Sequence, residues 1–447
     1  MTDDRSTDVR THHDDPDVTH APETPPPEEQ HTAEKYPCGG GPRVSRRAVL
    51  KGIGVGAAAV VLVGAGGVSI RALTNGVFDS GDGAPYDLWA TWGSQPGVRA
   101  IVAAGVLAAN PHNIQPWVFT VSDTTIDLYG DPRRVMPIND SDGRERMVGF
   151  GCAIENMVCA ARNSGLDPVI TPFPDGDPGH IAHLDVRHGR PPTGTERALA
   201  AAIGLRHSNR GPYESRALDM DDLHQLDGPV SSEQSGFAPG SPTATTTTPQ
   251  IVWIADEPRR RALGELYVHA TQAIIDDEQM SKESFAWFRN DRHAIDSHRD
   301  GLTLDGQGLT PMMLTAAKLL PAQSRESGDT FWLKTTREVH TATAGAYGIV
   351  RVGDVGSPLD RLAGGRLLQH VHLVATAHHL GLQHMNQITE RIARDGSLSR
   401  PNRFGPAWSD IIGIPANQGL VSFRVGYPER TASSSPRRAL SDVVDTR

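Results

Sequence analysis

Two kinds of apolar periodicity alternate along the chain from Asp87 onward, and this alternation restricts the fold more than any other feature. Some stretches repeat apolar residues every three or four positions, which is typical of amphipathic helices, and others alternate apolar and polar residues, which is typical of half-buried strands. Strands beside helices of ordinary length indicate a layered α+β or α/β domain. We predict helices at 97–109, 149–165, 194–204, 258–277, 311–320 and 364–381. We predict strands at 117–121, 125–128, 181–186, 250–254, 346–352 and 419–426.

Length, charge and cysteine content narrow the classes of protein that the chain can represent. With 447 residues it can hold two or three domain-sized units and a large buried core. Its formal net charge of −10 gives no indication of a basic surface that would bind nucleic-acid phosphates, so we expect no nucleic-acid partner. The three cysteines form no CxxC or CxxH pair, and we expect no metal site. Cys152 and Cys159 share one apolar stretch and are predicted to be buried small residues.

The beginning of the chain has the composition of a leader and not of a folded domain. Residues 1–44 are rich in Asp, Glu, His, Thr and Pro, so they are predicted to be disordered. Residues 45–74 begin Ser-Arg-Arg-Ala-Val-Leu-Lys and continue as a Gly, Ala and Val run, which resembles a twin-arginine (Tat) export signal. The alternative is an ordinary N-terminal membrane anchor, because roughly 20 apolar residues can span a bilayer.

The charges around this segment indicate its orientation. Basic residues precede the apolar run, and acidic residues follow it, so both interpretations place the N-terminus in the cytoplasm and the folded part outside. We therefore expect export by the Tat pathway, with the Tat translocon as a partner during export. The exported protein is expected to be extracytoplasmic, either released or held as a membrane tether by the uncut segment.

Two stretches of the chain echo each other. Gly149 to Gly165 and Gly365 to Gly381 both run 16 residues (165 − 149 and 381 − 365), and a leucine follows each. The echo suggests a duplicated unit that folds as an internal pseudo-dimer, with a first half at 87–200 and a second half at 201–447. The alternative is coincidence, since Gly is the preferred residue after a helix C-terminus. Residues 228–249, rich in Ser, Thr, Gly and Pro, are predicted to be a linker or surface insertion.

The run from Asn110 to Trp117 reads Asn-Pro-His-Asn-Ile-Gln-Pro-Trp and joins a predicted helix to a predicted strand. Proline fixes its own φ and restricts the residue before it, so this loop is predicted to be stiff. Asn113 and Gln115 present donors and acceptors together, which suits in-plane recognition of a planar heterocycle. The alternative is a structural turn in which Trp117 fills the core. His112 is either a donor beside such a ligand or a structural side chain.

A second run, from Leu205 to Tyr213, concentrates positive charge. If it is extended, Arg206, Ser208 and Arg210 project to the same side, and if it is a helical turn the two arginines are neighbours four positions apart. In both cases two guanidinium groups and a hydroxyl converge, which suits a phosphate dianion. The alternative is a solvated basic patch. A further basic pair, Arg437 and Arg438, lies near the C-terminus, where its alternative is a charged tail.

Together the two motifs, Pro-x-x-Asn-x-Gln-Pro-Trp-x-Phe and Arg-x-Ser-x-Arg, resemble those of the nitroreductase superfamily of FMN flavoproteins. Their order is reversed relative to ordinary members, and about ninety residues separate them, as in the Acg-type branch of single chains with two fused nitroreductase-like halves. The resemblance covers roughly Asp87 to Val444. It departs from the family loop at Asn110 and at His112-Asn113. It implies an α+β nitroreductase-like fold whose two halves form an intramolecular pseudo-dimer, and a monomer is therefore expected.

The resemblance also implies roles for individual residues. The cationic run would hold the FMN phosphate and ribityl chain, and one of the two C-terminal arginines would add a phosphate contact. The loop would meet the isoalloxazine ring or line the substrate side, and the segment at 385–387 would lie near the reactive N5 atom. No catalytic acid, base or nucleophile is expected, because the flavin carries the electron chemistry. The expected cofactor residues are Arg206, Ser208, Arg210, Pro111, His112, Asn113, Gln115, Met385, Asn386, Gln387, Arg437 and Arg438.

The expected function is that of an FMN-dependent oxidoreductase, which reduces small planar acceptors such as nitroaromatics or quinones by two electrons. Relatives of this kind use NAD(P)H as the electron donor, whereas the export signal also leaves room for a membrane quinol. The alternative is a non-catalytic protein that binds and sequesters FMN beneath a lid. The candidate lid is the long segment at 283–335.

Overall fold

The computed structural model describes residues 75–77, 80–226 and 247–446. The predicted disordered region at 1–44, the predicted export signal at 45–74 and most of the predicted linker at 228–249 lie outside these residues. Within the described residues, no helix combines the length and apolar character needed to cross a bilayer.

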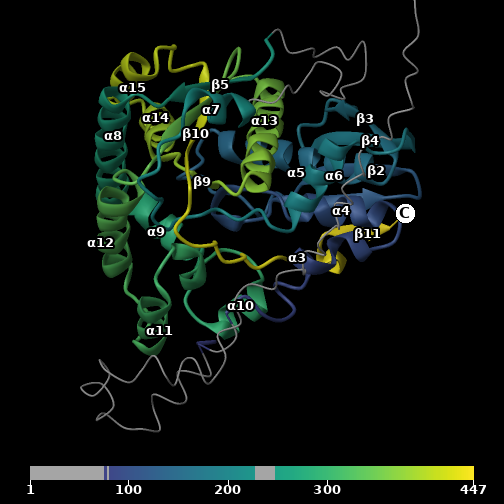
Figure 1. Cartoon of the computed structure of the whole chain (residues 1–447), viewed down its shortest axis with the longest axis horizontal. Coiled ribbons are helices and arrows are strands. Elements are labelled where there is room, and N and C mark those ends of the chain that lie inside the picture. The colour runs from purple at the N-terminus through teal and green to yellow at the C-terminus, as the bar shows by residue number, and fades with distance from the viewer. Residues whose placement is uncertain (1–74, 78–79, 227–246, 447) are drawn as a thin grey trace, which may run out of the picture. The chain divides into compact units, whose positions relative to one another are not determined.

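The first of two larger sheets has the strand order β11-β1-β2-β4-β3. Its neighbours are antiparallel, except that β11 pairs in parallel with β1, where Phe119 lies opposite Val444. The C-terminal segment reaches this sheet after crossing over from β10, as the yellow trace in Figure 1 shows. The strands are β1 (Trp117–Val121), β2 (Thr125–Gly130), β3 (Leu166–Pro172), β4 (His180–His188) and β11 (Val444–Thr446).

The second sheet is antiparallel throughout and has the order β5-β8-β10-β9. All eight residues of β10 are buried, which indicates that the sheet is covered on both faces. A parallel pair of two-residue strands, β6 (Phe288–Arg289) and β7 (Leu302–Thr303), lies in the candidate lid segment. The strands of the second sheet are β5 (Gln250–Ile254), β8 (Ala346–Arg351), β9 (Gly381–His384) and β10 (Gly419–Gly426).

Two long helices, α5 (Arg144–Asn163) and α13 (Pro358–Ala377), pack against each other between the two sheets. They contain most of the two stretches that echo each other in the sequence, which extend beyond the helices to Gly165 and Gly381. Glycines let the two backbones approach, because a Cβ atom on Gly151 would lie 2.2 Å from the carbonyl oxygen of Leu362. A Cβ atom on Gly365 would lie 2.2 Å from the carbonyl oxygen of Val148.

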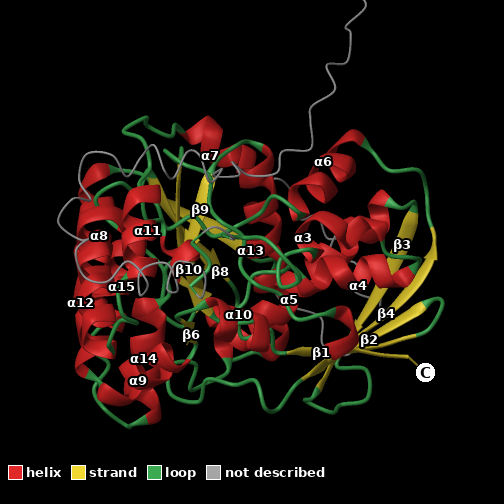
Figure 2. Ribbon diagram, turned by 90° about the horizontal axis from the view of Figure 1, so that it is seen from below, coloured by secondary structure: helices red, strands yellow, loops and turns green. Residues whose placement is uncertain are grey.

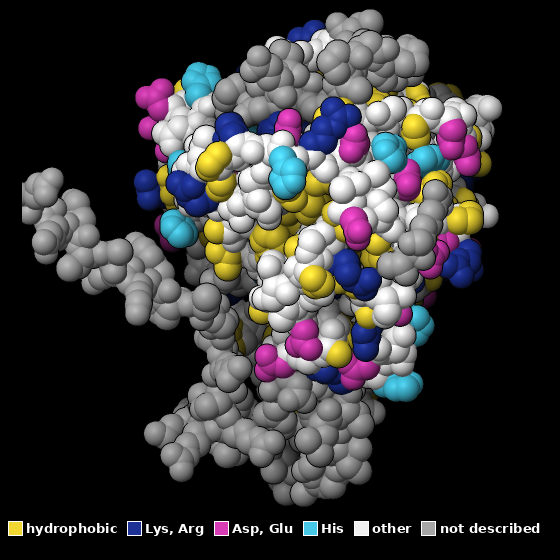
Figure 3. All heavy atoms as spheres, turned by 90° about the vertical axis from the view of Figure 1, so that its right-hand side faces the viewer, with side chains coloured by type: hydrophobic (Ala, Val, Ile, Leu, Met, Phe, Trp, Pro, Cys, Tyr) yellow, Lys and Arg dark blue, Asp and Glu magenta, His cyan; other side chains and the backbone are white. Residues whose placement is uncertain are grey.

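The remaining helices surround the sheets. Figures 1 and 2 show α4 beside the first sheet and α8, α14 and α15 on the side of the second. The helices are α3 (Leu88–Thr91), α4 (Val98–Val106), α6 (Gly194–Ile203), α7 (Met220–Leu226), α8 (Glu257–Asp276), α9 (Glu278–Ala286), α10 (Arg292–His298), α11 (Pro311–Leu319), α12 (Arg325–Thr335), α14 (Gln387–Ser397) and α15 (Gly405–Ile412). On the face drawn in Figure 3, basic and acidic side chains are mixed, so no continuous basic stripe crosses this face.

The predicted α+β class is confirmed, and strands β1, β5 and β10 begin and end where the sequence predicts. The helix predicted at 364–381 is wrong at both ends, since α13 begins at Pro358 and ends at Ala377. The backbone turns left-handed at His379, with φ +59°, and β9 follows. Strand β3 was not predicted because two prolines interrupt its apolar pattern, which is typical of edge strands.

Candidate functional site

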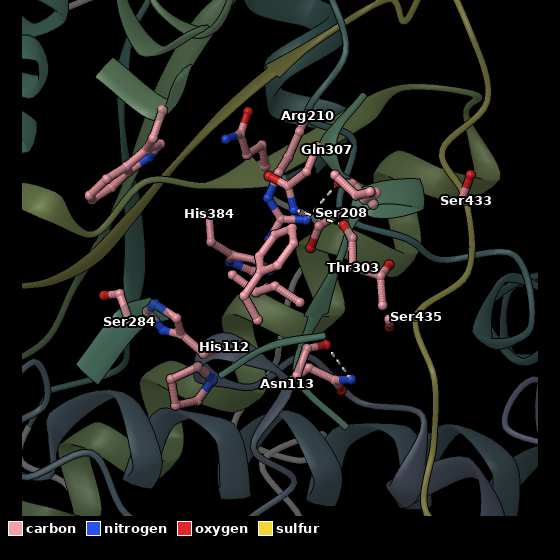
Figure 4. Close-up of a pocket in the computed structure, with 18 of the residues that line it drawn as sticks. His112, Asn113, Ser208, Arg210, Ser284, Thr303, Gln307, His384, Ser433 and Ser435 are labelled. Carbon is pink, nitrogen blue, oxygen red and sulfur yellow. Dashed lines mark hydrogen bonds between the residues drawn. The ribbon is translucent and has the colours of Figure 1, made fainter. Parts of the chain in front are cut away.

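Six separated parts of the chain, together with His340 and Leu368, line one cavity of about 560 Å³. They are the loop after α4, the beginning of α5, the cationic run at 206–210, the candidate lid segment, and two stretches near β9 and the C-terminus. Figure 4 shows side chains of several of these parts, among them His112, Ser208, Arg210 and His384, converging on the cavity. The loop and the cationic run, about ninety residues apart in sequence, therefore share one crevice.

The loop holds an unusual backbone. His112, Asn113 and Gln115 have φ values of +44°, +56° and +51°, a left-handed region that non-glycine residues seldom adopt. The Asn110 side chain stabilises this shape, since its Oδ1 accepts from the Gln115 backbone N–H at 2.8 Å and its Nδ2 donates to the Ala108 carbonyl. The loop is thus constrained by its side chains as well as by its prolines.

The two carboxamides of the loop bind peptide groups of other segments. Asn113 Nδ2 donates to the carbonyl oxygens of Gly301 (3.1 Å) and Pro436 (2.9 Å). Gln115 Nε2 donates to the Arg299 carbonyl, and its Oε1 accepts from the Arg438 backbone N–H, both at 2.8 Å. The loop therefore fastens the base of the candidate lid and the C-terminal segment to each other.

This arrangement corrects the expectation for Gln115. Its side chain is fully buried, it does not line the cavity, and its carboxamide is occupied by backbone partners. Pro111, His112 and Asn113 do line the cavity.

The cationic run is extended, which decides between the two conformations that the sequence left open. Ser208 forms an isolated parallel bridge with Leu382 of β9, and Arg206, Ser208 and Arg210 all line the cavity. Arg206 donates to the Leu107 carbonyl at 2.7 Å and Arg210 to the Gly306 carbonyl at 3.1 Å. Neither guanidinium has a carboxylate within ion-pair distance among the described residues, and the Nε of Arg206 is buried without a partner.

These buried cations remain charged at neutral pH. Burial lowers the pKa of Arg206 and of Arg210 to about 10, which is still well above 7. Arg437 also lines the cavity, and the guanidinium groups of Arg206 and Arg437 lie 5.5 and 4.7 Å from the ring of Trp89. Both also donate to the Leu107 carbonyl. Like charges this close in an apolar setting are stabilised by an anion.

The two C-terminal arginines differ in place. Arg437 donates to Asn113 Oδ1 at 2.6 Å and to Ser435 Oγ at 2.6 Å, so it faces the cavity from the loop side. Arg438 does not line the cavity, because its guanidinium donates to the Asp442 carbonyl at 2.6 Å. The sequence left open which of the two would contact a phosphate, and the structure places only Arg437 at the wall.

Several histidines at or near the cavity are neutral. Burial lowers the pKa of His112 to about 4, and burial together with nearby arginines lowers the pKa of His207 and His384 to about 3. The positive charge of the site therefore comes from guanidinium groups. His384 Nε2 is buried at the cavity wall and has no hydrogen-bond partner within the described part of the chain, and the sequence analysis does not predict it as a site residue.

The segment after β9 is divided between the core and the cavity. Asn386 and Gln387 line the cavity, and Gln387 Oε1 is buried with no hydrogen-bond donor from the residues that the structure describes. Met385 does not line it, which corrects the expectation for this residue. Its side chain is fully buried in the core beside the second sheet, while its backbone N–H donates to the Ser422 carbonyl at 2.8 Å.

The candidate lid segment forms one wall of the cavity, through residues between Ser284 and Trp332. Its base is fixed by Asp300, which is 3% exposed and accepts from Arg134 at 2.8 Å and from Arg289 at 2.6 Å. A second buried pair, Lys318 with Asp305 at 2.8 Å, joins α11 to the turn after β7. The wall is therefore anchored by ion pairs and by the carboxamides of the loop.

No family model matches the chain. A protein of Mycobacterium tuberculosis (strain H37Rv) named "Putative NAD(P)H nitroreductase Rv3131" is 34% identical over 356 residues, which cover 78% of this chain and 91% of that protein. The chain belongs to this nitroreductase family. A second protein of the same organism, named "Putative NAD(P)H nitroreductase acg", is 32% identical over 117 residues, which cover 26% of this chain and 35% of that protein.

Solved nitroreductase structures also align with parts of the chain. The FMN-dependent nitroreductase NfnB of Mycobacterium smegmatis, in complex with NADPH, has a TM-score of 0.34 and 15% identity, and the match covers 56% of this chain and 98% of that one. A nitroreductase with bound FMN from Bacteroides fragilis has a TM-score of 0.30 and 14% identity, with 54% and 94% covered. The chain is placed in the nitroreductase family by its similarity to the Rv3131 protein, of which it covers 91%.

Proposed function

We propose that the protein is an FMN-dependent oxidoreductase of nitroreductase type that reduces small planar acceptors, nitroaromatic or quinone-like, by two electrons. One observation carries the proposal: Arg206, Ser208 and Arg210 line the same cavity as the 111–113 loop. Two charged guanidinium groups without a carboxylate partner among the described residues suit a phosphate monoester. The names of the family relatives, which are NAD(P)H nitroreductases, support the same chemistry.

The residues present fit FMN. Arg206, Ser208 and Arg210 would hold the phosphate, with Arg437 as a further cation, and Asn113 would position the loop beside the ring. At the wall, His384 Nε2 and Gln387 Oε1 have no hydrogen-bond partner among residues 75–77, 80–226 and 247–446, so they are available to the polar edge of a ring. When bound, the flavin would supply the two-electron transfer, while the chain orients it and excludes water.

Flavin binding is tested on the purified protein. We expect a yellow protein that releases FMN on denaturation, because the guanidinium groups that line the cavity would bind the FMN phosphate. The double variant Arg206→Ala/Arg210→Ala should lose FMN, whereas Arg187→Ala, which removes an exposed arginine of β4, should retain it. A colourless native protein that cannot bind added FMN would contradict the proposal.

The electron donor is the next question, and we propose NAD(P)H, with a membrane quinol as the alternative that export would favour. Anaerobic bleaching of the flavin absorbance by NADH, NADPH or a soluble quinol analogue separates these donors. Rapid bleaching by the quinol analogue alone would contradict the nicotinamide donor.

A second candidate function is sequestration of FMN without turnover. The observation that favours it is the anchored wall between Ser284 and Trp332, which takes up much of the cavity lining. Replacing Asp300 with Ala would unpair Arg134 and Arg289 and loosen that wall. If the protein is an oxidoreductase, Asp300→Ala should then turn over faster than the unchanged protein. If no donor reduces the bound FMN in the unchanged protein or in Asp300→Ala, sequestration is favoured.

We also propose that the chain is exported by the Tat pathway and is extracytoplasmic, either released or tethered, and that it is a monomer whose halves at 87–200 and 201–447 form a pseudo-dimer. The sequence at 45–74 supports export, and the packing of α5 against α13 supports the duplication. Replacing Arg46 and Arg47 with Lys should leave the protein in the cytoplasm in cell fractionation. Light scattering that gives a dimer mass would contradict the monomer.

A further inference from the structure

Two carboxyl groups that sequence reasoning did not single out meet at the cavity wall. Glu145 lies in the first turn of α5 and Glu390 in the first turn of α14, and both line the cavity. The two side chains are within hydrogen-bonding reach of each other. Glu145 is 8% exposed, and its Oε1 has no hydrogen-bond donor in the described part of the chain. A buried carboxylate oxygen without a donor is unfavourable, so a proton or a ligand must satisfy it.

The charges around the pair do not neutralise it. Asp140, before α5, and Glu283, on α9, both add negative charge. The nearby cation, Arg391 on α14, is committed to Asp277 at 3.3 Å and to Asp395 at 2.6 Å. Two carboxylates in contact cannot both be ionised without a large cost, so the pair retains one proton that the two groups share.

We propose that Glu145 and Glu390 are a proton-sharing pair that supplies the proton for reduction of the acceptor in the cavity. This inference rests on the proposed function. A quinone-like acceptor receives a hydride, which brings two electrons, from the reduced flavin, and a proton from the carboxyl pair, and becomes a hydroquinone. A nitro group that receives the same hydride and proton becomes an N,N-dihydroxy species, which loses water to give the nitroso product. The carboxylate then recovers its proton from solvent.

The titration of the pair suits this task. Burial raises the pKa of Glu390 to about 7, and burial with the charge of Glu390 raises the pKa of Glu145 well above its ordinary value. A general acid is most effective when its pKa lies near the working pH. The acid form of Glu390 is lost as the pH rises through 7, so reduction of the acceptor should slow on the alkaline side.

The first test does not depend on turnover. Infrared spectroscopy of the protein at pH 6, with and without FMN, should show the C=O stretching band of a protonated buried carboxyl. This band should lose intensity in Glu145→Gln/Glu390→Gln, where Asp140, whose pKa burial raises to about 6, still contributes, and it should be unchanged in Glu265→Gln, which changes an exposed glutamate of α8. Absence of the band in the unchanged protein would overturn the inference, whatever its activity. A band of equal intensity in the double variant would also overturn the inference.

The second test separates the two half-reactions by rapid mixing. In Glu145→Gln and Glu390→Gln we expect reoxidation of the flavin by a quinone to slow much more than its reduction by the donor, since only reoxidation takes a proton from the pair. Reoxidation by a quinone should slow on the order of 10²-fold and lose its alkaline decline. Unchanged reoxidation with an unchanged pH profile would overturn proton delivery while the proposed function stands. Failure of the unchanged protein to bind FMN would instead overturn the proposed function, and the inference with it.

Discussion

At the scale of single residues, the site is held together by side chains that bind backbone. Asn113 and Gln115 contact four peptide groups in two distant segments, around residues 299–301 and 436–438. Their bonds are buried, so water cannot replace a lost partner. These hydrogen bonds hold the loop in its left-handed backbone conformation, which would be unfavourable without them.

Replacing Asn113 with Ala should lower the free energy of unfolding by on the order of 2–3 kcal/mol, because it removes a donor from the buried carbonyls of Gly301 and Pro436 and an acceptor from the Arg437 guanidinium. Urea denaturation followed by tryptophan fluorescence measures this change. Gln272→Ala, which alters an exposed carboxamide on α8, serves as the control and should change stability little. Equal stability of the two variants would show that the hydrogen bonds of the Asn113 side chain do not stabilise the fold.

Raised carboxyl pKa values also predict how stability depends on pH. Burial raises the pKa of Asp140 to about 6 and that of Glu390 to about 7, so the folded protein binds protons that the unfolded chain has already released near pH 5. These groups therefore lower the free energy of unfolding as the pH rises from about 5 to 7. For each proton released, the unfolding equilibrium constant increases by up to about tenfold per pH unit. Denaturant titrations across this range should show the decline, and Glu390→Gln should weaken it.

At the scale of elements, the crossing of α5 and α13 decides how the two sheets are joined. A methyl group on Gly151 would meet the backbone of Leu362, which cannot rotate away as a side chain could. Gly151→Ala should therefore lower the free energy of unfolding by about 3 kcal/mol through overpacking. Gly396→Ala in α14, where nothing lies within 4 Å of the added atom, is the matched control. Thermal unfolding that moves equally in both variants would rule out a tight crossing.

At the scale of the whole molecule, the C-terminal segment joins the two sheets. It leaves β10 in the second sheet, passes the cavity with Arg437 and pairs as β11 with β1 of the first. Removing residues 428–447 should lower the melting temperature by on the order of 5–10 °C and release FMN, because the strand and a cavity cation are lost together. Removing residues 1–44 is the control and should leave the melting temperature unchanged. Calorimetry and flavin absorbance measure both effects.

Some of the architecture could be predicted because it depends on local pattern. Strand β10 follows directly from the apolar period, and so does the helix predicted at 97–109, although α4 covers only Val98–Val106. The burial of Cys152 and Cys159 follows from their shared apolar stretch. The cationic run and the proline-pinned loop were recognised by residue type. Strand β11 could not be predicted, since three residues acquire strand structure only by pairing with β1, more than three hundred positions away.

Local sequence encodes the periodicity of the helices and strands, the concentration of guanidinium groups at 206–210 and the two prolines of the 110–117 loop, because these depend on neighbours along the chain. Only the packing of distant elements turns Gln115 and Met385 away from the cavity, makes Arg437 rather than Arg438 face it, and brings Glu145 to Glu390. Such pairings join residues up to several hundred positions apart. They arise from the packing of whole elements, and no local pattern encodes which distant group will satisfy a buried donor, acceptor or charge.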